Sequence, residues 1–141
     1  MVTAPGVNRG DTTGEEDRRP HGSGCGLAFT AACRIFEISK RFPREETYSL
    51  TDQIRRASRA VCSGIAEGWR RRRYEAAFVN KLNEAEAEGA ETQVWSAFEF
   101  ASGYMTKEED DEIQETYDHI LRMLVKMSID PKPWILFRLG K

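Results

Sequence analysis

The chain has 141 residues, of which 40% are hydrophobic and 31% are charged, and its formal net charge is -2 at pH 7. This size and apolar content predict one domain with a modest core, and they exclude a membrane-spanning protein, because the longest strongly apolar run covers only residues 134–137. The small net charge hides a segregation: residues 34–81 hold 12 basic and 6 acidic side chains, whereas residues 82–121 hold 1 basic and 12 acidic ones.

The N-terminal part of the chain divides into an extension and a first helix. Residues 1–24 are rich in glycine and mixed charges, so we expect a disordered extension that lacks the apolar centre of a targeting signal. A helix bundle is predicted over residues 25–130. Its first helix ends near Pro43, because proline disfavours helical geometry in the residue before it. The apolar residues at helical spacing in this helix are Leu27, Ala31, Ile35, Ile38 and Phe42.

The second helix is predicted over residues 47–67 and has the most informative charge pattern of the chain. Its buried stripe is Leu50, Ile54, Ala57, Val61, Ile65 and Gly68. Three arginines, Arg55, Arg56 and Arg59, are predicted on the opposite, solvated side. Four more, Arg70, Arg71, Arg72 and Arg73, follow where Gly68 allows the helix to end. We expect Gly64 and Gly68 to let a neighbouring helix approach rather than to cradle a phosphate, because no P-loop pattern is present.

The third helix is predicted over residues 74–102, and its many small residues lead us to expect the tightest helix contact there. Its predicted buried face is Phe78, Leu82, Ala85, Gly89, Thr92, Trp95 and Phe98. Gly103 closes this helix, and Thr106 with Glu109 forms the capping-box signature of a fourth. The seam of the fourth helix has the spacing of a coiled coil: Ile113, Tyr117, Ile120, Leu124 and Met127. The predicted fold is therefore an all-α, antiparallel up-and-down four-helix bundle, with an apolar C-terminal tail over residues 131–141 that should dock on a surface.

Two segments resemble a known family. KRFPREETYSL and QIRRAS…SGIAEGWRR are similar to the four-helix bundle family related to the protein encoded by intervening sequences in bacterial large-subunit ribosomal RNA. The resemblance covers about residues 33–133, and one departure is Gly64, where the family usually has Asn. The family pattern is carried by Gln53, Arg55, Arg56, Ala57, Ile65, Ala66, Glu67 and Gly68. Family members resemble a diversity-generating-retroelement accessory protein, which implies a homopentamer that binds nucleic acid and a reverse transcriptase.

No combination of residues predicts an enzyme, a metal or another cofactor. Nucleophilic catalysis needs a histidine beside serine or cysteine, and the chain has only His21, in the extension, and His119. A di-iron site needs Glu-x-x-His on two helices, but Glu115 and His119 are four residues apart, and no second histidine accompanies the glutamates of the third helix, Glu84, Glu88 and Glu91. The cysteines, Cys25, Cys33 and Cys62, form no CxxC pair, which fits a reducing, cytoplasmic location without zinc.

The arginines are the candidate binding residues. A planar guanidinium donates two parallel hydrogen bonds to a phosphate. The four consecutive arginines lie between the C-terminus of one helix, whose dipole favours cations, and the N-terminus of the next, whose dipole opposes them, so interactions with helix ends alone do not explain them. We predict a non-enzymatic, oligomeric scaffold that binds the backbone and shape of RNA or DNA through Arg55, Arg56, Arg59, Arg70, Arg71, Arg72 and Arg73. Trp69, beside them, could stack on a base but is better explained as an anchor of the bundle end. The alternative is a protein–protein adaptor whose arginines contact acidic surfaces, including those of another subunit.

Overall fold

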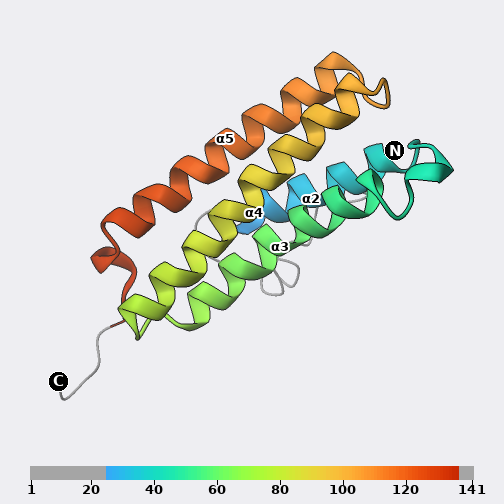
Figure 1. Cartoon of the computed structure of the whole chain (residues 1–141). Helices are drawn as coiled ribbons and strands as arrows, with labels where there is room; N and C mark the ends of the chain where they lie inside the picture. The colour runs from blue at the N-terminus through green and yellow to red at the C-terminus, as the bar shows by residue number, and fades with distance from the viewer. Residues whose placement is uncertain (1–24, 137–141) are drawn as a thin grey trace, which may run out of the picture.

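The computed structural model describes residues 25–136, and within them the chain is all-α, as predicted. Its α-helices are α2 (Cys25–Ser39), α3 (Leu50–Arg70), α4 (Glu75–Ala101) and α5 (Lys107–Ile129), and its two short 3-10 helices are η2 (Arg44–Glu46) and η3 (Lys132–Trp134). α3 packs on α4, α4 on α5, and α2 on both α3 and α5, which closes a four-helix bundle (Figure 1). The predicted extension, residues 1–24, lies outside the described residues.

The bundle core is built from one stripe of each helix. All five residues predicted for the seam of the fourth helix are buried on α5. On α3, every predicted stripe residue except Leu50, which is half-buried at the start of the helix, is buried as well. Helical spacing therefore identified these two buried faces correctly. None of the described helices is both long and apolar enough to cross a membrane.

The predicted buried face of α4 is wrong in its last two turns. Ser96 and Glu99 are buried there, whereas Trp95 is only half-buried and Phe98 is 52% exposed. The buried residues repeat every seven positions, as Phe78, Ala85, Thr92 and Glu99, and as Leu82, Gly89 and Ser96. This repeat keeps one face of the helix towards its neighbours. Phe98 lies outside that face and stays exposed, although its side chain is larger and more apolar than those of Ser96 and Glu99. The prediction followed the apolar residues instead of the repeat.

The helix ends follow local signals. Gly103 has a φ of +85°, a conformation that favours glycine, and it ends α4 as predicted. The predicted capping box is present on α5: Glu109 N–H donates to Thr106 Oγ1 at 3.1 Å, and Thr106 N–H donates to a Glu109 carboxylate oxygen at 3.0 Å. α3 starts three residues later than predicted, because residues 44–46 form η2 and the Glu46 carboxylate accepts from the N–H of Leu50.

Glycines set the distance between α3 and α4. A Cβ atom added to Gly64 would lie 3.2 Å from Cβ of Ala85, and one added to Gly68 would lie 3.2 Å from Cβ of Lys81. Such contacts are tighter than side chains normally make, so glycine allows the close approach that the sequence predicted. Gly64 faces Ala85 and Gly68 faces Lys81, so residue numbers decrease along α4 as they increase along α3. The two helices therefore run in opposite directions, as Figure 1 also shows.

The C-terminal tail returns to its own bundle. Trp134 and Ile135 pack against the hydrophobic core, and the N–H of Leu136 donates to the carbonyl oxygen of Arg72 at 3.1 Å. The expected docking is confirmed for these residues, and the rest of the tail, residues 137–141, lies outside the described part of the chain. The tail thereby contacts the turn that holds the four consecutive arginines.

Candidate nucleic-acid interface

The turn between α3 and α4 holds residues 71–74 in a fixed backbone conformation. The N–H of Arg71 donates to Gly68 O at 2.9 Å, and the N–H of Tyr74 donates to Arg71 O at 3.0 Å. The carbonyl of Tyr74 then accepts from Phe78 N–H at 2.9 Å, in the first turn of α4. These hydrogen bonds fix the positions from which the arginine side chains extend.

Arg72 differs from the other three arginines of the turn. Its Cζ lies 4.0 Å from the centroid of the Trp69 ring, and its Nε donates to the Trp69 carbonyl at 2.9 Å. Trp69 in turn lies 6.4 Å, centroid to centroid, from buried Phe78. Trp69 therefore anchors the bundle end, as the sequence indicated, and it holds Arg72 in place by a cation–π contact.

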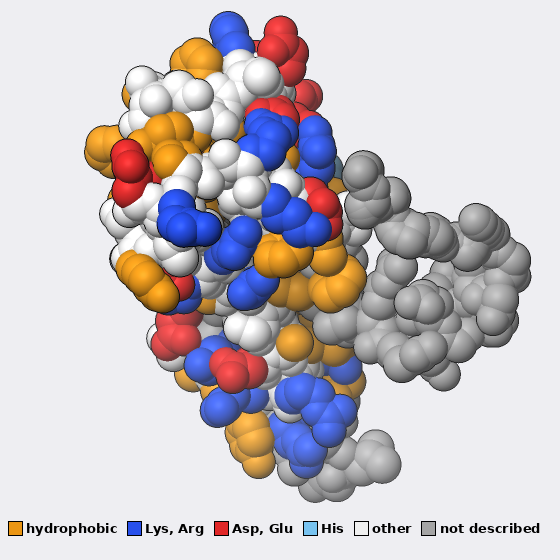
Figure 2. Space-filling view, turned by 90° about the vertical axis from the view of Figure 1, so that its right-hand side faces the viewer, with side chains coloured by type: hydrophobic (Ala, Val, Ile, Leu, Met, Phe, Trp, Pro, Cys, Tyr) orange, Lys and Arg blue, Asp and Glu red, His pale blue; other side chains and the backbone are white. Residues whose placement is uncertain are grey.

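Arg70, Arg71 and Arg73 are exposed to solvent. Among the described residues, the side chains of Arg70 and Arg73 form no hydrogen bond or ion pair, and that of Arg71 only adds to the positive field that lowers the pKa of Glu67. The main cause of that lowered pKa is Lys81, whose Nζ lies 2.9 Å from the Glu67 carboxylate. Figure 2 shows Lys and Arg side chains gathered at its lower end, the height at which the α3–α4 turn lies in Figure 1.

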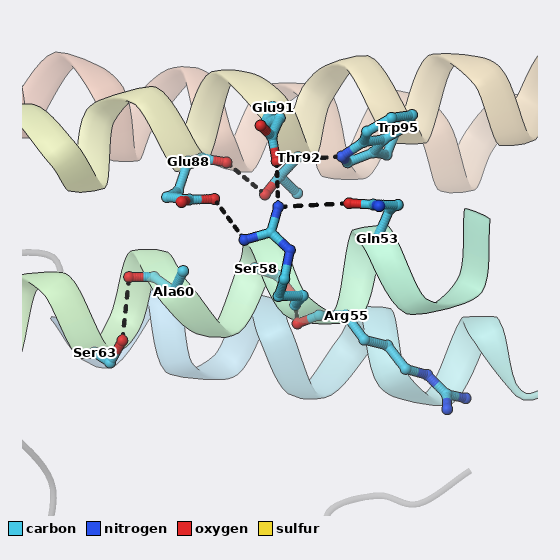
Figure 3. A network of polar contacts seen from close by, with 10 residues as sticks. Gln53, Arg55, Ser58, Ala60, Ser63, Glu88, Glu91, Thr92 and Trp95 are labelled. Carbon is cyan, nitrogen blue, oxygen red and sulfur yellow. Dashed lines mark hydrogen bonds and ion pairs between the residues drawn. The ribbon is translucent and has the colours of Figure 1, made fainter. Parts of the chain in front are cut away.

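Arg56 lies far from this turn and is engaged within the chain. It reaches from α3 to α4, where its Nη2 lies 2.6 Å from Oε1 of Glu91 and its Nη1 lies 3.4 Å from Oε1 of Glu88. Its Nη2 also contacts the Gln53 side chain at 3.5 Å. Figure 3 shows this network, with Arg55 pointing away from it. Arg56 thus links α3 to α4 by ion pairs.

Arg55 and Arg59 lie on the other side of α3, against α2. The Cζ atoms of Arg55 and Arg59 lie 4.6 and 5.6 Å from the centroid of the Phe36 ring, and Nζ of Lys40 lies 5.1 Å from it. Nε of Arg55 also donates to Ser39 Oγ at 2.7 Å. The structure therefore separates the seven predicted arginines into three groups: the α3–α4 turn, the α2 side of α3, and the α4 side of α3.

The opposite end of the bundle is acidic. The first turn of α5 contains Glu108, Glu109 and Asp110, which suit the positive end of a helix dipole. Two arginines partly neutralise this end: Arg41 pairs with Glu109 at 2.7 Å and Arg34 pairs with Glu112 at 2.9 Å. The hydrogen bonds from Arg41 lower the pKa of Glu109. The acidic first turn of α5 thus lies at the end of the bundle opposite the α3–α4 turn, and arginines from α2 and the residues after it pair with carboxylates of α5.

Among the described residues, the glutamates and the histidine considered for metal binding do not converge, and His21 lies outside this part of the chain. Glu88 and Glu91 contact Arg56, Glu84 pairs with Lys81 at 3.1 Å, and both Glu115 and His119 are exposed on α5. Within residues 25–136, no group of three or more His, Cys, Asp or Glu side chains could hold a metal ion.

Two residues with unusual surroundings, Tyr74 and Glu99, were not predicted from the sequence. Tyr74, 60% exposed, directly follows the arginine run, and this adjacency was a signal that could have identified it. Glu99 is 0% exposed, and neither of its carboxylate oxygens has a hydrogen-bond partner among the described residues. Burial raises the pKa of Glu99 to about 8, and the nearby charges of Glu46 and Asp110 add to this rise. The seven-residue repeat that runs from Phe78 through Ala85 and Thr92 to Glu99 was the sequence signal for this burial.

The comparisons with known proteins agree with this architecture. The family described as 23S rRNA-intervening sequence protein matches residues 25–126. This match begins eight residues before the resemblance seen in the sequence and includes all of α2. The crystal structure of a protein with unknown function from the S23 ribosomal protein family of Bacteroides thetaiotaomicron is similar, with a TM-score of 0.68 and 25% sequence identity. The similarity covers 74% of this chain and 97% of that chain. No curated protein matches the sequence.

Proposed function

The chain belongs to the 23S rRNA-intervening sequence protein family, and we propose that it is a non-enzymatic, oligomeric scaffold that binds RNA or DNA through its arginines. The observation that carries this proposal is the α3–α4 turn, where Arg70, Arg71 and Arg73 are exposed on a hydrogen-bonded backbone. Two of the three, Arg70 and Arg73, have no anionic partner among the described residues. Their guanidinium groups can therefore bind phosphates without first breaking an ion pair.

The remaining predicted arginines would contribute unequally. Arg55 and Arg59 stack near Phe36 but form no ion pair within the described residues, so their remaining donors can reach a phosphate. Arg56 would have to exchange Glu88 and Glu91 for the ligand, and Arg72 would have to leave Trp69. Recognition in this proposal is of backbone and shape, because phosphate contacts position a nucleic acid without reading its sequence.

The oligomer in this proposal is supported by an exposed apolar face on α4. Val94 is 50% exposed and Phe98 is 52% exposed, and the intervening Ala97 is exposed as well. Covering such a face with a second copy would remove apolar area from water. A closed ring would also repeat the arginine turn, so that several weak phosphate contacts act together. The family resemblance implies a pentamer and a reverse transcriptase partner, and we include both as parts of the proposal.

A second candidate, the protein–protein adaptor, is favoured by one contact. Arg56 binds two glutamates of its own chain, so the arginines of α3 are able to select carboxylates. The acidic first turn of α5 would offer such carboxylates to the arginine turn of another copy. In this case the turn arginines would hold subunits together.

One experiment separates the two candidates. Binding to a structured RNA and to duplex DNA is measured across a salt series for the natural protein and for Arg70→Gln/Arg71→Gln/Arg73→Gln, with the native mass of each recorded. Nucleic-acid binding predicts that the variant keeps its mass, loses affinity, and has a log–log salt slope shallower by about three. A matched control, Arg44→Gln/Lys107→Gln/Arg122→Gln, removes the same charge from exposed residues outside both arginine groups and should bind normally. A variant that falls apart into monomers, together with a natural protein that binds neither nucleic acid, would contradict the proposal and favour the adaptor.

A further inference from the structure

The α3–α4 turn places an exposed aromatic ring among its arginines. Tyr74 directly follows Arg73 and is 60% exposed, and its side chain forms no hydrogen bond or ring contact within residues 25–136. The other aromatic residue of this turn, Trp69, is already packed between Phe78 and Arg72. Tyr74 is therefore the aromatic ring of the turn whose face is open to a ligand.

Stability of the bundle does not explain Tyr74. It is the N-cap residue of α4, but its side chain makes no capping hydrogen bond, and Ser, Thr, Asp or Asn would stabilise that position better. Its ring is not packed against the hydrophobic core, unlike Trp69 and Trp134. An exposed ring at a position that favours a capping residue indicates a role outside the bundle.

The backbone around Tyr74 is suited to hold a ring in one place. Tyr74 N–H donates to Arg71 O, and its carbonyl accepts from Phe78 N–H. The carbonyl of Arg72, two residues before it, accepts from the tail residue Leu136. Because the backbone is already ordered, stacking a base on Tyr74 loses little conformational entropy of the protein.

We propose that Tyr74 is a stacking platform for an unpaired nucleobase, so that the ligand of this turn is single-stranded RNA or DNA, or a strand with unpaired nucleotides. This inference rests on the proposed nucleic-acid function and names its ligand class. Arg70, Arg71 and Arg73 bind the phosphates on either side, and the ring of Tyr74 takes the face of the base between them. A base within a duplex already stacks on its neighbours and offers no open face, so fully paired duplexes bind through phosphate contacts alone.

The test compares a 12-nucleotide single-stranded RNA with a blunt duplex of the same sequence, at one salt concentration. The proteins are the natural chain, Tyr74→Leu, Tyr74→Phe and, as a matched control, Tyr48→Leu, since Tyr48 is 93% exposed in the α2–α3 turn.

We expect the natural chain to prefer the single strand. Tyr74→Leu should weaken single-strand binding about 5- to 100-fold and leave duplex binding unchanged. Tyr74→Phe and Tyr48→Leu should both bind like the natural chain, because Phe keeps the ring. A 2-aminopurine base in the strand should lose fluorescence on binding the natural chain and Tyr74→Phe, but not Tyr74→Leu.

Failure of this inference is distinguishable from failure of the proposed function. If Tyr74→Leu binds the single strand as the natural chain does, while Arg70→Gln/Arg71→Gln/Arg73→Gln does not, stacking is overturned and phosphate binding stands. If the natural chain binds neither ligand at low salt, the nucleic-acid function is overturned, and the stacking platform with it.

Discussion

The guanidinium of Arg72 lies over the ring of Trp69, with its Cζ 4.0 Å from the ring centroid, while its Nε donates to the carbonyl of the same residue. These two contacts make Arg72 part of the bundle end, although it belongs to an uninterrupted run of four arginines. Arginines of one turn therefore have different surroundings: Arg72 packs on Trp69, whereas Arg70 and Arg73 are exposed and form no ion pair within the described residues.

This division predicts different effects of the same substitution. Arg72→Gln removes a cation–π contact and a hydrogen bond, so it should lower the free energy of unfolding by about 1–2 kcal/mol. Arg70→Gln, two residues before Arg72 and exposed, should change this free energy by less than about 0.5 kcal/mol while weakening nucleic-acid binding. Urea unfolding of both variants checks this. Equal stability of the two would mean that the Trp69 contact contributes nothing.

The buried carboxyl of Glu99 predicts that the bundle loses stability as the pH rises. The pKa of Glu99 is about 8 in the folded chain, against an ordinary value of 4.5. Between these values the unfolded chain has released the proton and the folded chain retains it. The stability is therefore fully present below the ordinary pKa and declines by up to about 1.4 kcal/mol per pH unit until the pH exceeds about 8.

Substitution of Glu99 isolates this effect. Glu99→Gln cannot ionise, so the variant should be more stable than the natural chain at pH 8 and should have a flatter stability profile between pH 5 and 8. Thermal unfolding at several pH values measures both, and Glu108→Gln, on the exposed first turn of α5, is the control. Parallel profiles for Glu99→Gln and the natural chain would show that Glu99 is ionised in the folded state.

The close approach of α3 and α4 predicts a specific interaction between two small residues. Gly64→Ala would place a Cβ 3.2 Å from that of Ala85, whereas a Cβ at Gly26 in α2 would meet nothing within 4 Å. Alanine stabilises a helix by roughly 0.5–1 kcal/mol relative to glycine, so Gly26→Ala should raise the stability. Gly64→Ala should lower it, because overpacking costs about 1–3 kcal/mol. Adding Ala85→Gly to Gly64→Ala should relieve the close contact and restore part of the lost stability. A double-mutant cycle on the free energy of unfolding measures this interaction. Additive effects of the two substitutions would contradict the predicted steric overlap.

The exposed apolar face of α4 predicts how the chain self-associates. Val94→Ser/Phe98→Ser should leave the bundle folded but reduce its native mass to that of a monomer, because both side chains are about half-exposed in the single chain. The matched control is Ile129→Ser, which changes a residue 77% exposed at the end of α5. A variant that keeps the mass of the natural protein would exclude this face as the subunit contact. A natural chain that is itself monomeric would remove the oligomer from the proposed function.

Several features of this protein were determined by sequence alone. The α5 seam, the stripe of α3, the Thr106 capping box and the Gly103 stop could all be predicted, because each depends on residues within a few positions of one another. The same holds for the chain's family, whose motifs are short and contiguous. Local geometry fixes the periodicity of a helix and the hydrogen bonds at its ends, so local residues are enough to infer them.

The tertiary structure decided which side chains are available. Arg55 and Arg56 are neighbours in sequence, but successive residues of a helix point about 100° apart, so one meets α2 and the other meets the glutamates of α4. Phe98 and Glu99 are neighbours in the same way, and the seven-residue repeat of α4 buries the carboxylic acid and exposes the aromatic ring. In both cases the outcome depends on which helix lies opposite, and the residues that determine this belong to other helices of the bundle.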